Sequence, residues 1–119
     1  MRLKDKVALV TGSGRGIGFA IARHLAKEGA WVALCDIDEG LVTKAAETLR
    51  QEGFKVLGYK ADVTDTPAIE TMVEDIIGQW GGIDILVNNA GVILVKKALD
   101  IIDEEWDRVF RVNVPGTFA

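Results

Sequence analysis

The strongest constraint on the fold is a strict alternation of strand-like and helix-like segments along the chain. Short apolar runs, typical of strands buried on both faces, cover residues 7–12, 31–36, 55–62 and 83–91. Segments with helical periodicity lie between them, and the clearest one places on one face Ile69, Met72, Val73, Ile76, Ile77 and Trp80. This alternation predicts an α/β protein whose strands form one parallel sheet joined by right-handed crossovers.

The order of the strands follows from the direction in which the chain moves across the sheet. Strands that step outward in one direction, followed by a return past the first strand, predict the order 3-2-1-4. The reversal puts helices on both faces of the sheet, so we expect three layers, α/β/α. In such sheets a ligand binds at the carboxyl ends of the strands where the order reverses, here between the first and fourth strands.

Glycine, proline and acidic residues mark the expected helix ends. Asp38 is predicted to cap the second helix, and Pro115 is predicted to kink a last helix near Asn113. The first helix is indicated by Ile17, Ile21 and Leu25, which recur four apart with Ala22 beside them, and it is expected to stop at Gly29. The inner face of the second helix is predicted to carry Leu41, Ala45 and Leu49. The last helix, beginning at Asp103, is predicted to bury Trp106, Val109, Phe110 and Val114.

The composition is that of an ordinary soluble protein and excludes several functions. The 119 residues have room for one domain, 1–119, with 49% apolar and 27% charged residues. A net charge of −4 argues against a nucleic-acid partner, and no apolar run approaches the ~20 residues that span a membrane. Cys35 is the only cysteine, and the start runs directly into a strand without a targeting leader. We therefore expect a cytoplasmic protein without disulfides, and we predict no metal site.

The loop after the first strand, "TGSGRGIG" at residues 11–18, is rich in glycine. It matches neither G-x-G-x-x-G nor the phosphate loop that ends in Gly-Lys. Gly12 would let the strand turn sharply, Gly16 would leave space for a pyrophosphate, and Gly18 would let the helix pack close to the sheet. Because an ordinary tight turn rarely needs so many glycines, we predict that this loop binds a dinucleotide.

Asp36 and Arg15 bear on which dinucleotide binds. Asp36 ends the second strand, at the spacing where an acid grips the adenosine ribose. Its carboxylate would repel a 2′-phosphate and so favours NAD, whereas the Arg15 guanidinium could pair with such a phosphate. A charge at bonding distance is hard to offset, so the sequence predicts NAD over NADP.

Five motifs occur in the order of the short-chain dehydrogenase/reductase family, and the chain resembles that family throughout its length. The motifs are "TGSGRGIG", "CDID", "ADVTD", "VNNAG" and "NVPGTF". The resemblance implies a Rossmann-like fold and an alcohol–ketone hydride transfer with a nicotinamide dinucleotide.

The resemblance also implies which residues contact the cofactor. The pyrophosphate would lie among Gly12, Arg15, Gly16, Ile17 and Gly18, with Ser13 in the same loop. It implies that Asp36 holds the adenosine ribose and that adenine lies between Asp62 and Val63. It places Asn89, Ala90 and Gly91 along the nicotinamide ribose. Asn113 would match the catalytic asparagine whose kinked helix holds a water in a proton relay.

The sequence departs from the family in its catalytic residues. The family continues to a serine and a Tyr-x-x-x-Lys pair, but the only serine here is Ser13, in the glycine loop. Tyr59 is the only tyrosine, and the residue four positions later is Val63. The chain is therefore predicted to be a cofactor-binding half that is inactive alone. Two alternatives stay open. The first is an active oxidoreductase that uses another acid and base or is completed by another chain. The second is a non-catalytic interaction module.

The remaining candidates have simpler interpretations. His24 is expected to face solvent, and Cys35 is expected to be a small core residue. Trp31, Trp80 and Trp106 fall at packing positions. The fourth strand has no expected neighbour on its outer side, and the last helix has an apolar face. We therefore expect a homodimer or larger assembly through one of these two elements.

Overall fold

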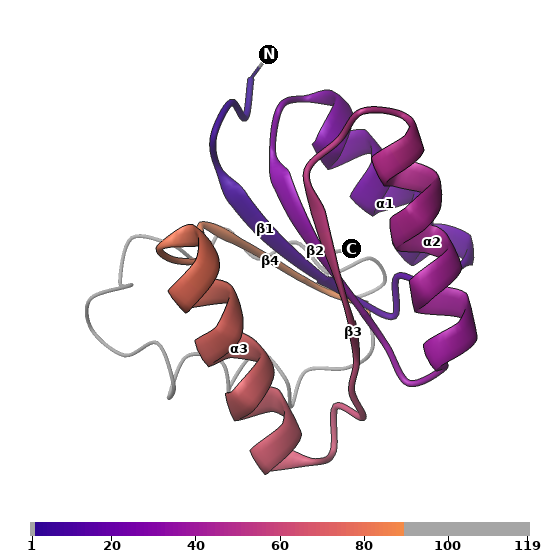
Figure 1. Cartoon of the computed structure of the whole chain (residues 1–119), viewed down its shortest axis with the longest axis vertical. Coiled ribbons are helices and arrows are strands. Elements are labelled where there is room, and N and C mark those ends of the chain that lie inside the picture. The colour runs from indigo at the N-terminus through magenta and orange to yellow at the C-terminus, as the bar shows by residue number, and fades with distance from the viewer. Residues whose placement is uncertain (1, 90–119) are drawn as a thin grey trace, which may run out of the picture.

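The computed structural model describes residues 2–89, and the secondary structure in this part alternates as the sequence predicts (Figure 1). The strands are β1 (Val7–Thr11), β2 (Trp31–Asp36), β3 (Val56–Lys60) and β4 (Ile85–Asn88). The helices are α1 (Gly16–Lys27), α2 (Glu39–Gln51) and α3 (Thr66–Trp80). The predicted last helix lies outside the described residues, so the extent of the domain over 1–119 stays a prediction.

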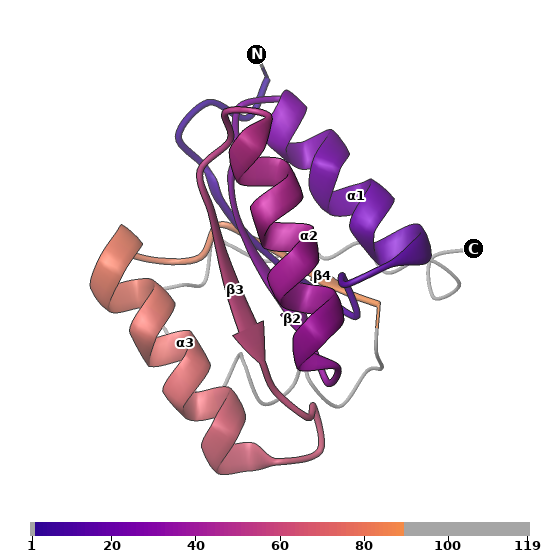
Figure 2. The same cartoon turned by 45° about the vertical axis from the view of Figure 1, so that its right-hand side comes forward.

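The strands form one parallel sheet in the order β3-β2-β1-β4, which confirms the predicted topology. Helices α1 and α2 cover one face and α3 covers the other, as Figure 2 shows from the side. β1 pairs with β2 on one side and with β4 on the other, so the order reverses at β1. The carboxyl ends of β1 and β4 therefore form the edge where a ligand is expected.

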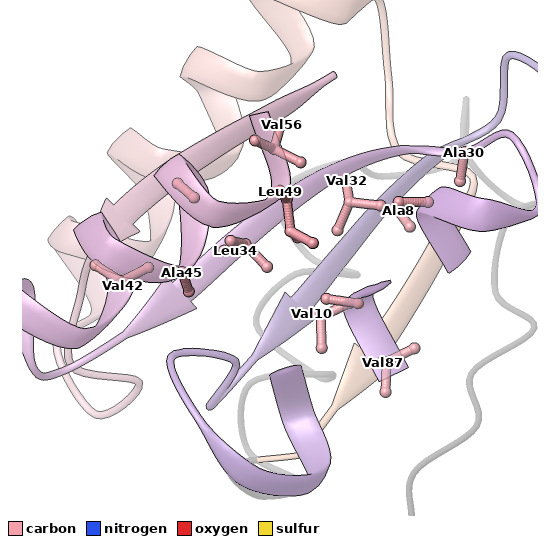
Figure 3. Close-up of a cluster of buried hydrophobic side chains, with 13 residues drawn as sticks. Ala8, Val10, Ala30, Val32, Leu34, Val42, Ala45, Leu49, Val56 and Val87 are labelled. Atoms are coloured by element: carbon pink, nitrogen blue, oxygen red, sulfur yellow. The ribbon is translucent and has the colours of Figure 1, made fainter. Parts of the chain in front are cut away.

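The face under α1 and α2 is packed with small and medium apolar side chains (Figure 3). Of the residues whose apolar repeat indicated α1, Ile17 is 65% exposed and Ala22 is buried. The buried residues of α1 are Gly18, Ala22 and Ala26. The helix lies so close to the sheet that only small side chains fit beneath it, and larger ones lie to the sides. On α2, Ala45 and Leu49 are buried as predicted, whereas Leu41 is only partly buried and Val42 lies inside.

The face under α3 carries larger side chains, and its helix confirms the predicted periodicity. The buried residues of α3 are Ile69, Met72, Val73 and Ile76. Trp31 and Trp80 pack edge to face with ring centroids 5.6 Å apart, and the Lys55 ammonium lies 4.2 Å from the centroid of a Trp31 ring. Two of the three tryptophans are therefore packing residues as predicted, and Trp106 lies outside the described residues.

The helix starts show how the sequence sets the element bounds. The Asp38 side chain caps α2 by accepting a hydrogen bond from the Leu41 N–H at 3.0 Å, as predicted. The third strand is shorter than the predicted 55–62, because Lys60 pairs with Asp36, where β2 ends. The fourth strand likewise covers only part of the predicted 83–91 and ends in register with β1.

Candidate functional site

The glycine loop between β1 and α1 has a backbone that few other residues could adopt. Gly12 and Gly16 have φ angles of 61° and 63°, in the left-handed region. A Cβ on Gly18 would collide with the backbone carbonyl of Gly12, so the close approach of helix and strand requires glycine there. The predicted steric roles of Gly12 and Gly18 therefore agree with the structure.

The start of α1 has no side-chain cap from its own N-cap residue. Arg15 is the N-cap residue, its side chain makes no capping hydrogen bond, and the first turn has no acidic residue. A Cβ added to Gly16 would meet no atom of residues 2–89 within 4 Å, so these residues leave space open beside the loop. The exposed side chain of Ile17 follows directly. A helix start of this kind favours an anion, because its N–H groups and dipole are available to one.

The Asp36 carboxylate lies against the glycine loop and is held by two backbone amides. The Gly14 N–H donates to Oδ2 at 2.9 Å, and the Asp38 N–H donates to Oδ1 at 3.1 Å. A Cβ on Gly14 would lie 2.8 Å from Oδ2 and 2.9 Å from the Leu41 Cβ, so a larger residue here would displace the carboxylate or helix α2. The carboxylate is therefore fixed in orientation at the carboxyl end of β2.

Ser13 is fully buried, unlike the exposed part of the loop. Its hydroxyl donates to the Val10 carbonyl at 2.8 Å and accepts from the Cys35 N–H at 2.9 Å. The structure thus gives this side chain a structural role between β1 and β2. Its predicted contact with a cofactor stays a prediction, and these hydrogen bonds do not support it.

A cavity of about 170 Å³ opens beside Asp36 and brings together several predicted residues from different loops. It is lined by Gly12, Cys35, Asp36, Ile37, Ala61, Asp62 and Val63. Ile37, which is 62% exposed, was not among the residues predicted from the sequence, and Cys35 was predicted only as a core residue. The available signal for Ile37 was its place, an apolar residue directly after a strand that ends at the ligand edge.

Asp62 forms a tight turn just after β3. Its Oδ1 accepts hydrogen bonds from the Thr64 N–H at 2.9 Å and from the Thr64 hydroxyl at 2.7 Å. The backbone bond from Thr64, followed by the hydroxyl bond, lowers the pKa of the Asp62 carboxyl. Asp62 is thus held as a carboxylate at the wall of the cavity. Thr64 is a supporting residue that sequence analysis did not single out.

The end of β4 is bonded to the glycine loop. The Thr11 hydroxyl donates to Asn88 Oδ1 at 3.1 Å and accepts from the Asn89 N–H at 3.0 Å. The Asn89 amide donates to the Gly12 carbonyl at 3.3 Å. Of the predicted nicotinamide-side residues, Asn89 therefore adjoins the loop. Ala90, Gly91 and the predicted catalytic residue Asn113 lie outside the described residues.

The other titratable candidates are placed for structure. The Tyr59 hydroxyl donates to Asp75 Oδ2 at 2.6 Å on the edge strand β3. Burial raises the pKa of the Tyr59 phenol, and the hydrogen bond and charge of Asp75 raise it further. Burial, with a smaller contribution from the Asp36 charge, raises the pKa of the Cys35 thiol to about 12. His24 is exposed, as expected.

Within residues 2–89, no group of histidine, cysteine, aspartate and glutamate residues is arranged to hold a metal ion. None of the helices in the same part combines the length and the hydropathy that a membrane crossing needs.

Comparison with known proteins shows which family the chain belongs to. A family model described as short chain dehydrogenase matches residues 6–119. The chain belongs to the short-chain dehydrogenase family. The motifs that carried the resemblance, the parallel sheet and the glycine loop at its reversal point all agree with that membership.

Curated relatives of this short-chain dehydrogenase chain include an uncharacterized oxidoreductase of Thermotoga maritima, 44% identical over 116 residues. A sorbitol dehydrogenase of Cereibacter sphaeroides is 43% identical over 117 residues. Both alignments cover 98% of this chain but only 45% and 44% of the relatives. The chain thus spans less than half the length of these curated relatives.

Solved structures of the family have the same fold. A 2-keto-3-deoxy-D-gluconate dehydrogenase from Streptococcus agalactiae is 48% identical with a TM-score of 0.69, over 76% of this chain and 34% of that one. An actinorhodin polyketide ketoreductase variant, solved with NADPH, is 32% identical with a TM-score of 0.75. That match covers 81% of this chain and 47% of the ketoreductase.

Proposed function

We propose that this chain is the nicotinamide-dinucleotide-binding part of a short-chain dehydrogenase and that it prefers NAD to NADP. The observation that carries the proposal is the Asp36 carboxylate, fixed by two backbone amides beside the glycine loop and facing a cavity. A carboxylate in this position accepts ribose hydroxyls and repels a 2′-phosphate. Family membership alone does not choose the cofactor, since a structural neighbour was solved with NADPH.

The residues present fit the parts of such a cofactor. The uncapped start of α1 and the open space beside Gly16 suit a pyrophosphate. The cavity walls at Ile37 and Val63 offer apolar surface for adenine, with Asp62 beside them as a hydrogen-bond acceptor. When bound, the nicotinamide would supply the hydride donor or acceptor for an alcohol–ketone conversion. The chain's own residues bind and orient the cofactor at the carboxyl edge of the sheet.

We propose further that this chain alone binds the cofactor without useful turnover. The reaction needs a group that moves a proton to or from the substrate oxygen, typically worth ~10²–10⁴-fold in rate. Tyr59 is a poor candidate, because its hydroxyl is bonded to Asp75 and its pKa is raised rather than lowered. Ser13 is buried and bonded to backbone. Asn113, as an amide, could position a water but could not act as the base.

Calorimetry with NAD and NADP tests the cofactor preference. In Asp36→Asn the loss of a charged hydrogen bond, worth ~1.5–3 kcal/mol, should cut the preference for NAD about tenfold to a hundredfold. Glu39→Gln is the matched control, since it removes an equal charge from an exposed residue near the same strand end that does not line the cavity. Tighter binding of NADP by the unmodified protein would contradict the proposal.

Turnover is tested with protein freed of host dehydrogenases, by NADH oxidation with ketones and NAD reduction with alcohols. We expect none from this chain alone, and activity after addition of a separately expressed C-terminal half of a relative. Turnover that needs the cofactor and disappears in Asn113→Ala would instead favour an active site of another kind.

Self-association is the remaining part of the proposal. Among residues 2–89, β4 pairs with β1 and has no strand on its other side. An open parallel edge favours pairing, so we propose a homodimer or larger assembly. Light scattering at micromolar concentration should show it, and a uniform monomer would count against it.

A further inference from the structure

We infer that Ser13 is a positioning residue that sets how tightly Asp36 holds the cofactor ribose, although its own side chain never touches the cofactor. The inference rests on the proposed function and concerns the buried contact between the glycine loop and β2. Ser13 is fully buried, so it acts on a ligand only through neighbouring groups. Its hydrogen bonds identify those neighbours.

The Ser13 hydroxyl continues the β1–β2 ladder after the backbone of β1 has turned away. β1 ends at Thr11, in register with Cys35, and Gly12 then turns the chain through a positive φ. Ser13 bonds to both backbone groups of Cys35, because its N–H donates to the Cys35 carbonyl at 3.0 Å and its hydroxyl accepts from the Cys35 N–H at 2.9 Å. The residue thereby holds the loop against the end of β2.

The residues that follow Ser13 and Cys35 in the chain form the contact that faces the proposed cofactor. Gly14 follows Ser13, Asp36 follows Cys35, and the Gly14 N–H donates to Asp36 Oδ2 at 2.9 Å. This amide can reach the carboxylate only while the loop is held against the end of β2. Ser13 therefore fixes the distance between the loop and β2, and through that distance it fixes the carboxylate.

The result is a carboxylate that is oriented before any ligand arrives. Each Asp36 oxygen accepts one backbone N–H, from Gly14 or from Asp38, and each keeps further acceptor capacity. Two neighbouring hydroxyls of a ribose match two such oxygens. Since ordering a group in advance removes that cost from binding, a loosened carboxylate binds the same diol more weakly.

The first test needs no ligand. In Ser13→Ala, the buried Cys35 N–H loses the Ser13 hydroxyl and the loop loses a fixed point, so amide exchange of Gly14 and Cys35 measured by NMR should accelerate about tenfold. Val7→Ala is the control, because Val7 is buried at the other end of β1 and its truncation weakens the core without touching the loop. Equal acceleration at Gly14 in both variants, or none in Ser13→Ala, would overturn the inference.

The second test is a double-mutant cycle with NAD, followed by NMR titration so that weak binding can be measured. As a single substitution, Ser13→Ala should weaken NAD binding about tenfold. Added to Asp36→Asn, it should weaken binding less than twofold. An equal loss in both backgrounds would show that Ser13 does not act through Asp36. Failure of the unmodified protein to bind NAD would refute the proposed function instead, and the exchange experiment would still decide whether Ser13 holds the Gly14 amide on Asp36.

Discussion

The helices α1, α2 and α3 each follow a strand of the parallel sheet and so begin at the same edge, yet they begin in two different ways. α2 and α3 are capped by the side chains of Asp38 and Asp65, which accept hydrogen bonds from the N–H groups of their first turns. α1 begins after glycines, with Arg15 at the N-cap and no side-chain cap. The protein caps two helix starts with acidic side chains and leaves the third without such a cap, which is what the proposed binding of a pyrophosphate requires.

The glycines explain why α1 differs. A helix that starts beneath a cofactor needs backbone rather than side chains near the ligand, and it needs to lie close to the sheet. Gly18 allows the helix to lie close to the sheet, because a Cβ there would collide with the Gly12 carbonyl. Gly16, beside open space, puts backbone rather than a side chain near the ligand. α3 has a glycine too, Gly78, but it is exposed and a Cβ there would meet nothing within 4 Å in the described part of the chain.

The largest effect is expected from breaking the close approach of α1. Gly18→Ala places a Cβ against the Gly12 backbone, so helix and strand must separate, and we expect a loss of about 3 kcal/mol in the free energy of unfolding. Urea unfolding measures it. The matched control is Gly78→Ala, which should stabilise the protein by about 0.5–1 kcal/mol because an exposed helix interior favours alanine. Similar changes in the two variants would contradict the difference between these glycines.

The fold was predictable from sequence to the extent that it depends on alternation and chain direction. Strand order followed because parallel strands joined by right-handed crossovers leave few topologies. Asp38 was predictable because an N-cap depends only on local sequence. The exposure of Ile17 was not, since apolar periodicity takes no account of size, and the contact at Gly18 leaves room beneath α1 only for small residues.

The candidate site was predictable residue by residue but not in its internal contacts. The motifs indicated Gly12, Asp36, Asp62 and Val63, and the structure brings these four to one cavity. The inward turn of Ser13 was not visible, because it depends on how far β1 and β2 pair before the loop leaves the sheet. A loop composition shows which residues are near a ligand, but the pairing register decides which of them face it.

A smaller effect is expected from making α1 begin as the other helices do. Arg15 has extended backbone, with φ −163° and ψ 172°, which suits a capping residue. Arg15→Asp should therefore cap α1 and raise the free energy of unfolding by about 0.5–1 kcal/mol. The same carboxylate would occupy the donors and repel a pyrophosphate, so NAD affinity should fall at least tenfold by calorimetry, as an order-of-magnitude expectation.

Arg15→Ala separates the added acid from the lost guanidinium. It should leave the free energy of unfolding within about 0.5 kcal/mol of the unmodified value and weaken NAD binding less than Arg15→Asp does. If Arg15→Asp binds NAD as well as the unmodified protein, the start of α1 is not the anion site.

The smallest effect concerns pH and the acidic turn that leads into α3. The bonds from Thr64 lower the pKa of Asp62 below its unfolded value of about 3.9, so the unfolded chain takes up the proton first as the pH falls. The stability that Asp62 contributes is therefore present above about pH 4 and is lost as the pH falls through the folded pKa. The difference in unfolding free energy between the unmodified protein and Asp62→Asn should shrink over that range.

Thr64→Val keeps the backbone bond, which is the larger cause, and removes only the hydroxyl, so the pH dependence should weaken without vanishing. A difference that stays constant from neutral to acid pH would show that this turn does not depend on the charge of Asp62.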